Sequence, residues 1–190
     1  RRRQRHHPRH RPVAGDRFPR GTEQENKGLD MTKRKVYLET SVISYLTARP
    51  SKNVIEAGHQ QSTYLFWDRR EEFDLSASEL VLTECAAGDQ EAASKRLAAL
   101  HGIHLLEITH QSIELAKELV ATDIVPAKAS EDALHISIAT VHFADYLLTW
   151  NCRHIGNPEI QARIAENFRV KGLFLPFICT PEELMGGDDE

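Results

Sequence analysis

The sequence predicts a single α/β domain built on a central, mostly parallel sheet. At 190 residues the chain is long enough for one hydrophobic core and too short for two large domains. Its apolar share of 41 % and charged share of 27 % are typical of globular proteins. From Lys35 onward, short apolar runs alternate with longer amphipathic segments, which is the pattern of βα units around a parallel sheet.

The first 32 residues are predicted to form a disordered basic tail, with a nucleic-acid-binding arm as the alternative. Residues 1–30 carry nine Lys and Arg against four Asp and Glu, together with three Pro and three Gly. Because the globular pattern begins just after Met31, we expect translation to start there and the preceding residues to be upstream sequence. The folded domain is expected over residues 33–181, followed by an acidic, flexible C-terminus over 182–190.

The remainder of the chain is acidic. Residues 31–190 hold 15 Lys and Arg against 24 Asp and Glu, a net charge of −9, which argues against extensive binding to nucleic-acid phosphates. No apolar run reaches the 18 residues of a membrane span, and no secretory signal is recognisable, so we expect a cytoplasmic protein. The three cysteines are widely spaced, which predicts buried apolar side chains rather than disulfides or a zinc site.

Five short strands and seven helices are predicted. Ser130 and Asn157 are expected to cap helices, the latter with Pro158 at the first helical position. Three glycines, Gly88, Gly102 and Gly172, are expected to end helices. The strands are placed at residues 36–38, 73–77, 104–108, 146–150 and 175–179. The helices are placed from residue 41 to 48 and at 53–70, 79–87, 91–100, 110–121, 130–143 and 158–168.

Two glutamates are the first candidates for chemistry. Glu39 ends a predicted strand that leads through Thr40 into a helix, so its carboxylate belongs at the carboxyl edge of the sheet, where α/β proteins bind ligands. Glu79 and Glu84 flank the apolar stretch of S-E-L-V-L-T-E-C, and either acid can point toward that edge. Spacing alone does not choose between Glu79 and Glu84.

Two further segments end at the same edge. Asp132 lies in the first turn of a buried helix, and His135 shares its helix face as a buried core histidine or a supporting residue. The segment D-Y-L-L-T-W-N-C-R-H is a strand that leads into Thr149 and Asn151, with Arg153 close enough to meet a phosphate. Asp145 precedes this strand and is expected to lie far from the site.

Three carboxylates and an amide suit a hard divalent cation. Mg²⁺ and Mn²⁺ prefer oxygen ligands, and such an ion can activate water and neutralise charge on a phosphate. Motifs of nucleotide hydrolases, dinucleotide-binding enzymes, esterases and zinc proteases are missing from the sequence. The residues therefore favour a metal-dependent nuclease with Glu39, Glu84 and Asp132 as ligands.

Four segments together resemble the four ordered motifs of PIN domains, especially VapC-type toxins of bacterial toxin–antitoxin pairs. The segments are Y-L-E-T-S-V-I, L-V-L-T-E-C, E-D-A-L-H-I-S-I-A and L-L-T-W-N-C-R-H-I. The resemblance covers about residues 36–179. It implies a PIN-like three-layer α/β/α sandwich with four or five short strands. It also implies Mg²⁺- or Mn²⁺-dependent cleavage of single-stranded or structured RNA, a cognate antitoxin protein and frequent homodimers.

The four acidic positions of the family correspond to Glu39, Glu84, Asp132 and Asn151, with Thr40 and Thr149 in support. The family usually has Asp at the first position and often at the fourth, so Glu39 adds a methylene and Asn151 removes a charge. A PIN-like binding module without catalysis is therefore an alternative. A phosphohydrolase of small phosphate esters is a weaker one, since such enzymes commonly carry D-x-D where this chain has E-T-S.

Overall fold

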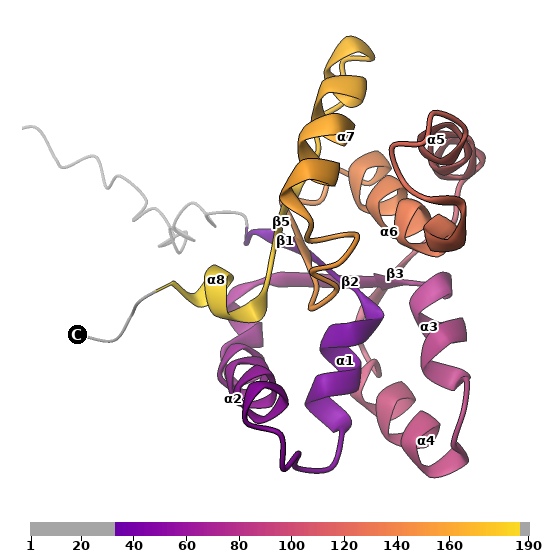
Figure 1. The fold of residues 1–190 in the computed structure, drawn as a ribbon. Helices are drawn as coiled ribbons and strands as arrows, with labels where there is room; N and C mark the ends of the chain where they lie inside the picture. Colours follow the sequence, from indigo (N-terminus) through magenta and orange to yellow (C-terminus); the bar gives the residue numbers. More distant parts are fainter. Residues whose placement is uncertain (1–32, 187–190) are drawn as a thin grey trace, which may run out of the picture. The chain divides into compact units, whose positions relative to one another are not determined.

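The computed structural model describes residues 33–186. It shows a five-stranded sheet with helices on both faces (Figure 1). The predictions of a basic tail over residues 1–32 and of a start at Met31 lie outside the described residues, as do residues 187–190 of the C-terminus predicted to be flexible over 182–190. Within residues 33–186, no helix combines the length and apolar character that crossing a membrane requires.

All five predicted strands and all seven predicted helices are present, with ends shifted by a few residues. The strands are β1 (Lys35–Leu38), β2 (Asp74–Ser78), β3 (His104–Leu106), β4 (Tyr146–Leu148) and β5 (Phe177–Cys179). The helices are α1 (Thr40–Thr47), α2 (Val54–Asp68), α3 (Glu79–Ala86), α4 (Gln90–Ala99), α5 (His110–Ala121), α6 (Ser130–Val141), α7 (Pro158–Val170) and α8 (Pro181–Met185). Two short 3₁₀ turns lie at Arg70–Glu72 and Ala127–Ala129.

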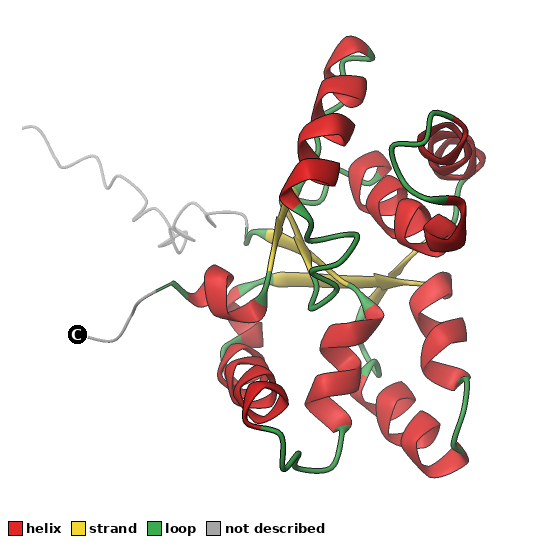
Figure 2. Ribbon diagram, in the orientation of Figure 1, coloured by secondary structure: helices red, strands yellow, loops and turns green. Residues whose placement is uncertain are grey.

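The sheet has the strand order β3-β2-β1-β4-β5, and each neighbouring pair is parallel. Helices α1 to α4 lie on one face, and α5, α6 and α7 lie on the other (Figure 2). The chain builds outward from β1 through β2 to β3 and then returns to the other side of β1 as β4. This reversal creates a switch point between β1 and β4, where open α/β sheets form their ligand crevice.

The core surrounds β1. Val36, Tyr37 and Leu38 are fully buried, as expected for the central strand of a parallel sheet covered on both faces. Helix α6 is buried along most of its length, because residues 133 and 135–140 are all inaccessible to solvent. The central strand and this helix form a rigid base for the side chains that follow them.

The predicted helix caps agree with the structure except at α6. Asn157 caps α7 as predicted, accepting hydrogen bonds from the backbone N–H groups of the next turn, and Pro158 follows it. Ser130 does not cap α6, because the preceding 3₁₀ turn runs directly into the helix and makes Ala129 the cap residue, without a side-chain bond. The three predicted glycine stops, Gly88, Gly102 and Gly172, all have positive φ.

Ordered structure continues past residue 181, where the sequence places the end of the domain. Helix α8 extends the domain to Met185 because Thr180 and Glu183 form a capping box. The Thr180 hydroxyl accepts from the Glu183 N–H at 3.1 Å, and the Glu183 carboxylate accepts from the Thr180 N–H at 2.8 Å. The sequence pattern T-P-E-E is typical of such a capped helix start.

Asp145 lies at the amino edge of the sheet, as expected. Its Oδ2 accepts a hydrogen bond from the Lys35 N–H at 2.8 Å, and its own N–H donates to the Lys35 carbonyl at 2.9 Å. The side chain therefore links the beginning of β1 to the beginning of β4.

We expect Asp145→Ala to lower the free energy of unfolding by about 1 kcal/mol, because the Lys35 N–H loses its acceptor. Urea denaturation measures this change. A free energy of unfolding equal to that of the wild-type protein would contradict this role of Asp145.

Candidate metal centre

Candidate residues from four segments meet at the carboxyl edge of the sheet. Glu39 follows β1, and its N–H donates to the carbonyl of Leu148 on β4 at 3.0 Å. Asn151 follows β4 three residues after Leu148. Glu84 projects from α3 and Asp132 from the first turn of α6. The site therefore occupies the switch point between β1 and β4.

Two hydroxyl groups hold the carboxylate of Glu39, which is 7 % exposed. Its Oε2 accepts hydrogen bonds from the hydroxyl of Ser41 and from Thr149 Oγ1, the latter at 2.7 Å. Ser41 Oγ in turn accepts from the N–H of Trp150 at 2.8 Å. No role was predicted for Ser41, although the motif E-T-S contains it.

Glu84 is held in the same manner. Its Oε2 accepts hydrogen bonds from the Thr40 hydroxyl and from His135 Nε2, the latter at 3.1 Å. Burial acts to raise the pKa of Glu84, but the hydrogen bond and attraction of His135, with the bond from Thr40, outweigh it and lower the pKa. Of the two acids that spacing left open, Glu84 faces the site, whereas Glu79 is exposed at the start of α3.

His135 is both a core residue and a partner of the acidic site. Its ring is 1 % exposed, and Nδ1 lies 2.8 Å from the hydroxyl of Tyr37. That hydroxyl lies 2.7 Å from Ser78 Oγ, and burial raises the pKa of Tyr37 far above its ordinary value. Tyr37 is not among the predicted site residues, because a tyrosine in a buried strand gives no sign of what its hydroxyl meets.

Asp132 and Asn151 form a separate pair. Asn151 Nδ2 donates to Asp132 Oδ1 at 2.9 Å, while Asn151 Oδ1 accepts from the backbone N–H of His154 at 3.2 Å. Burial raises the pKa of Asp132, and Glu39 adds to this, while Asn151, His154 and His135 oppose it. The amide of Asn151 therefore orients Asp132, and its carbonyl oxygen is occupied by the loop.

The donor atoms fit a hard divalent cation. Among residues 33–186, one group of three can place ligand atoms within 4.8 Å of one another, and it comprises Glu39, Glu84 and His135. Asp132 is outside that group. Within the described residues, no Lys or Arg forms an ion pair with the three acids, and hydrogen bonds reach only the Oε2 atoms of the two glutamates. The Oε1 atoms are the kind of oxygen donor that Mg²⁺ or Mn²⁺ prefers.

The loop after β4 is held at both ends. The ring of Trp150 stacks on His59 with centroids 4.0 Å apart, and its Nε1 donates to Thr63 Oγ1 at 2.9 Å. The N–H of Gly156 donates to the carbonyl of Asn151 at 2.8 Å.

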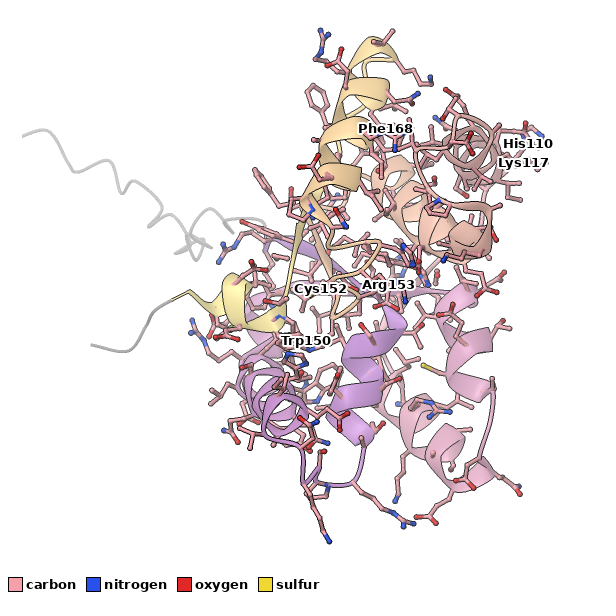
Figure 3. All side chains as sticks on the ribbon, in the orientation of Figure 1. His110, Lys117, Trp150, Cys152, Arg153 and Phe168 are labelled. Carbon is pink, nitrogen blue, oxygen red and sulfur yellow. The ribbon has the colours of Figure 1, made fainter. Side chains whose placement is uncertain are left out.

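Figure 3 labels Cys152 and Arg153 on this loop. Cys152 is exposed, contrary to the prediction of buried cysteines, whereas Cys85 is buried.

Comparison with known proteins supports the fold. A chain in the crystal structure of VapBC2 from Rickettsia felis, bound to a DNA fragment from their promoter, matches with a TM-score of 0.50 and 17 % identity, covering 77 % of this chain and 98 % of that one. VapC20 from Mycobacterium tuberculosis, a Sarcin-Ricin loop cleaving toxin, matches with a TM-score of 0.49 and 14 % identity, covering 67 % and 94 %. No family model and no curated protein matches the chain. The likeness to the VapBC2 chain confirms the predicted PIN-like fold.

Gly156→Ala is expected to disturb the site loop. An added Cβ would lie 3.2 Å from Cys152 Cα and 3.3 Å from the Asn151 carbonyl oxygen, both of which are backbone atoms. We expect a loss of about 1–3 kcal/mol in the free energy of unfolding, as for other overpacked sites, together with weaker Mn²⁺ binding. Gly58→Ala in α2 is the control, because its Cβ meets nothing within 4 Å and alanine favours the helix. Equal effects of the two substitutions would refute this reading.

The lowered pKa of Glu84 predicts a pH-dependent stability. Because the pKa is lowered in the folded state, the stabilisation is complete above the ordinary value of 4.5 and is lost as pH falls through the folded value. Urea denaturation should show wild-type protein losing stability relative to Glu84→Gln below about pH 4.5. Asp132 is present in both proteins, so its contribution to the pH dependence of stability cancels in the comparison. A constant difference from pH 7 to pH 3 would contradict the expectation.

Proposed function

We propose that this chain is a divalent-metal-dependent endoribonuclease. The observation that carries this proposal is the pair of carboxylates at the switch point, Glu39 and Glu84. Each has its Oε2 engaged by two donors, while Oε1 accepts no hydrogen bond from the described residues. Such a partly buried acidic pair, with no Lys or Arg to neutralise it within residues 33–186, is suited to a cation.

The proposed roles follow from the contacts. Glu39 and Glu84 hold the cation, and Thr149 and Thr40 fix their carboxylates. Asp132, oriented by Asn151, completes the acidic set. A divalent cation held there would supply the positive charge for phosphodiester hydrolysis by polarising the phosphate and activating water.

Substrate and partners are proposed from charge and from the PIN resemblance. A net charge of −9 over residues 31–190 disfavours long duplexes and favours a short, unpaired stretch of RNA as the substrate. The resemblance to VapC-type toxins, together with the VapBC2 likeness, supports a role as the cytoplasmic toxin of a toxin–antitoxin pair. A basic antitoxin segment complements the acidic body, and a homodimer is the proposed assembly.

The test is cleavage of short single-stranded RNA with and without Mg²⁺ or Mn²⁺. We expect cleavage only with the cation, and a loss greater than about a hundredfold in Glu39→Gln, Glu84→Gln and Asp132→Asn, because removing a ligand should cost more than removing a supporting residue. Asp145→Asn is the matched control, since this acid lies at the opposite edge of the sheet. Cleavage that needs no cation, or that persists in Glu39→Gln, would contradict the proposal.

A binding module without catalysis is the second candidate. It is favoured by one observation: the carbonyl oxygen of Asn151 is already bonded to the N–H of His154. Titration calorimetry with Mn²⁺ separates the two candidates. Binding at micromolar to millimolar Mn²⁺ together with RNA cleavage supports the nuclease, whereas the absence of binding at millimolar Mn²⁺ supports the module.

A further inference from the structure

A continuous chain of hydrogen bonds leads from the core to Glu84. It begins at Ser78, the cap residue of α3, and passes to the hydroxyl of Tyr37 over 2.7 Å. It continues from that hydroxyl to Nδ1 of His135 over 2.8 Å, and from Nε2 to Glu84 Oε2 over 3.1 Å. Ser78, Tyr37 and His135 are all buried, so this chain lies in the protein interior.

The chain holds the imidazole in one orientation. Tyr37 lies on the central strand and His135 on the buried helix α6, so both side chains are anchored in rigid elements. A hydroxyl can donate to Nδ1 or accept from it, and Ser78 can take the complementary role toward Tyr37. When the Tyr37 hydroxyl accepts from Ser78 and donates to Nδ1, the neutral imidazole carries its proton on Nε2 and donates a hydrogen bond to Glu84.

The carboxylate of Glu84 is therefore held in one orientation. His135 and Thr40 both reach Oε2 of Glu84, just as Ser41 and Thr149 both reach Oε2 of Glu39. A free glutamate side chain has three rotatable bonds, and fixing them costs conformational entropy. Here the fold has already fixed Oε2, so Oε1 can meet a ligand without that cost.

We propose that Tyr37 and His135 are positioning residues that preset Glu84 for a divalent cation, with His135 acting as a hydrogen-bond donor and not as a metal ligand. The proposal rests on the proposed function only for the presence of a cation at Glu39 and Glu84. It does not require that the protein cleave RNA.

Direct ligation by His135 is the competing arrangement, because Glu39, Glu84 and His135 each offer a ligand atom within 4.8 Å of the other two. Ligation requires Nε2 to lose its proton and its hydrogen bond to Glu84. That would leave Thr40 as the remaining donor to Glu84 Oε2 among the described residues. The two arrangements therefore differ in whether a nitrogen coordinates the ion.

The main variant is Tyr37→Phe, which removes one hydroxyl from the chain. Thr140→Val is its matched control, because Thr140 is 3 % exposed and lies on the same helix as His135. Its hydroxyl donates to the Ile136 carbonyl within α6 and to no other group of residues 33–186. We expect both variants to lower Tm by about 2–4 °C. Only Tyr37→Phe should weaken Mn²⁺ binding in calorimetry, by about tenfold to a hundredfold.

His135→Gln and His135→Ala extend the test. A glutamine amide can still donate to Glu84, so His135→Gln should retain more Mn²⁺ affinity than His135→Ala. Electron spin-echo envelope modulation of bound Mn²⁺ then reports any coordinated imidazole nitrogen. We expect the spectrum of the wild-type protein to contain no nitrogen coupling that is lost in the spectrum of His135→Gln.

Three results would overturn the proposal: Mn²⁺ affinity of Tyr37→Phe equal to that of Thr140→Val, a nitrogen coupling assigned to His135, or no Mn²⁺ binding by the wild-type protein. The last result would also remove the metal-dependent nuclease. If instead the wild-type protein binds Mn²⁺, Tyr37→Phe weakens that binding and RNA stays intact, the nuclease proposal fails and the positioning role stands.

Discussion

The parallel pairing of β1 with β4 is the contact on which the candidate site depends. It brings Glu39 beside Leu148, although 109 positions of sequence separate them, and the Glu39 N–H donates to the Leu148 carbonyl at 3.0 Å. The contact of Glu39 with Thr149 and that of Ser41 with the Trp150 N–H both follow from that register. A slip of one residue would turn these side chains to the other face of the sheet.

Hydroxyl groups stabilise the carboxylates that meet at this site. Bringing carboxylates together in a partly buried site is costly unless each is hydrogen-bonded or neutralised. Here serine, threonine and histidine donate to the two glutamates, and an asparagine amide donates to Asp132. Hydroxyl and amide donors stabilise the acids while leaving negative charge for a ligand, which a Lys or Arg partner would cancel.

Much of this arrangement was predictable from sequence, because it depends on strand ends. Parallel strands share one carboxyl edge, so Glu39, Thr149 and Asn151 could be placed there from their positions after apolar runs. The contacts of Tyr37 and His135 could not, since a buried polar side chain carries no sequence mark of its tertiary partner. Nor could the orientation of the Asn151 amide, which depends on the N–H of His154 in the folded loop.

The position of β4 late in the chain has a consequence for biosynthesis. A nascent chain that ends before residue 146 contains Glu39, Glu84 and Asp132 but lacks the strand that pairs with β1 on that side. Glu39 then has no Thr149, Asp132 has no Asn151, and the central strand has an open edge. The acidic site is therefore assembled only after most of the domain has left the ribosome, so an interrupted translation product carries the acids without the site.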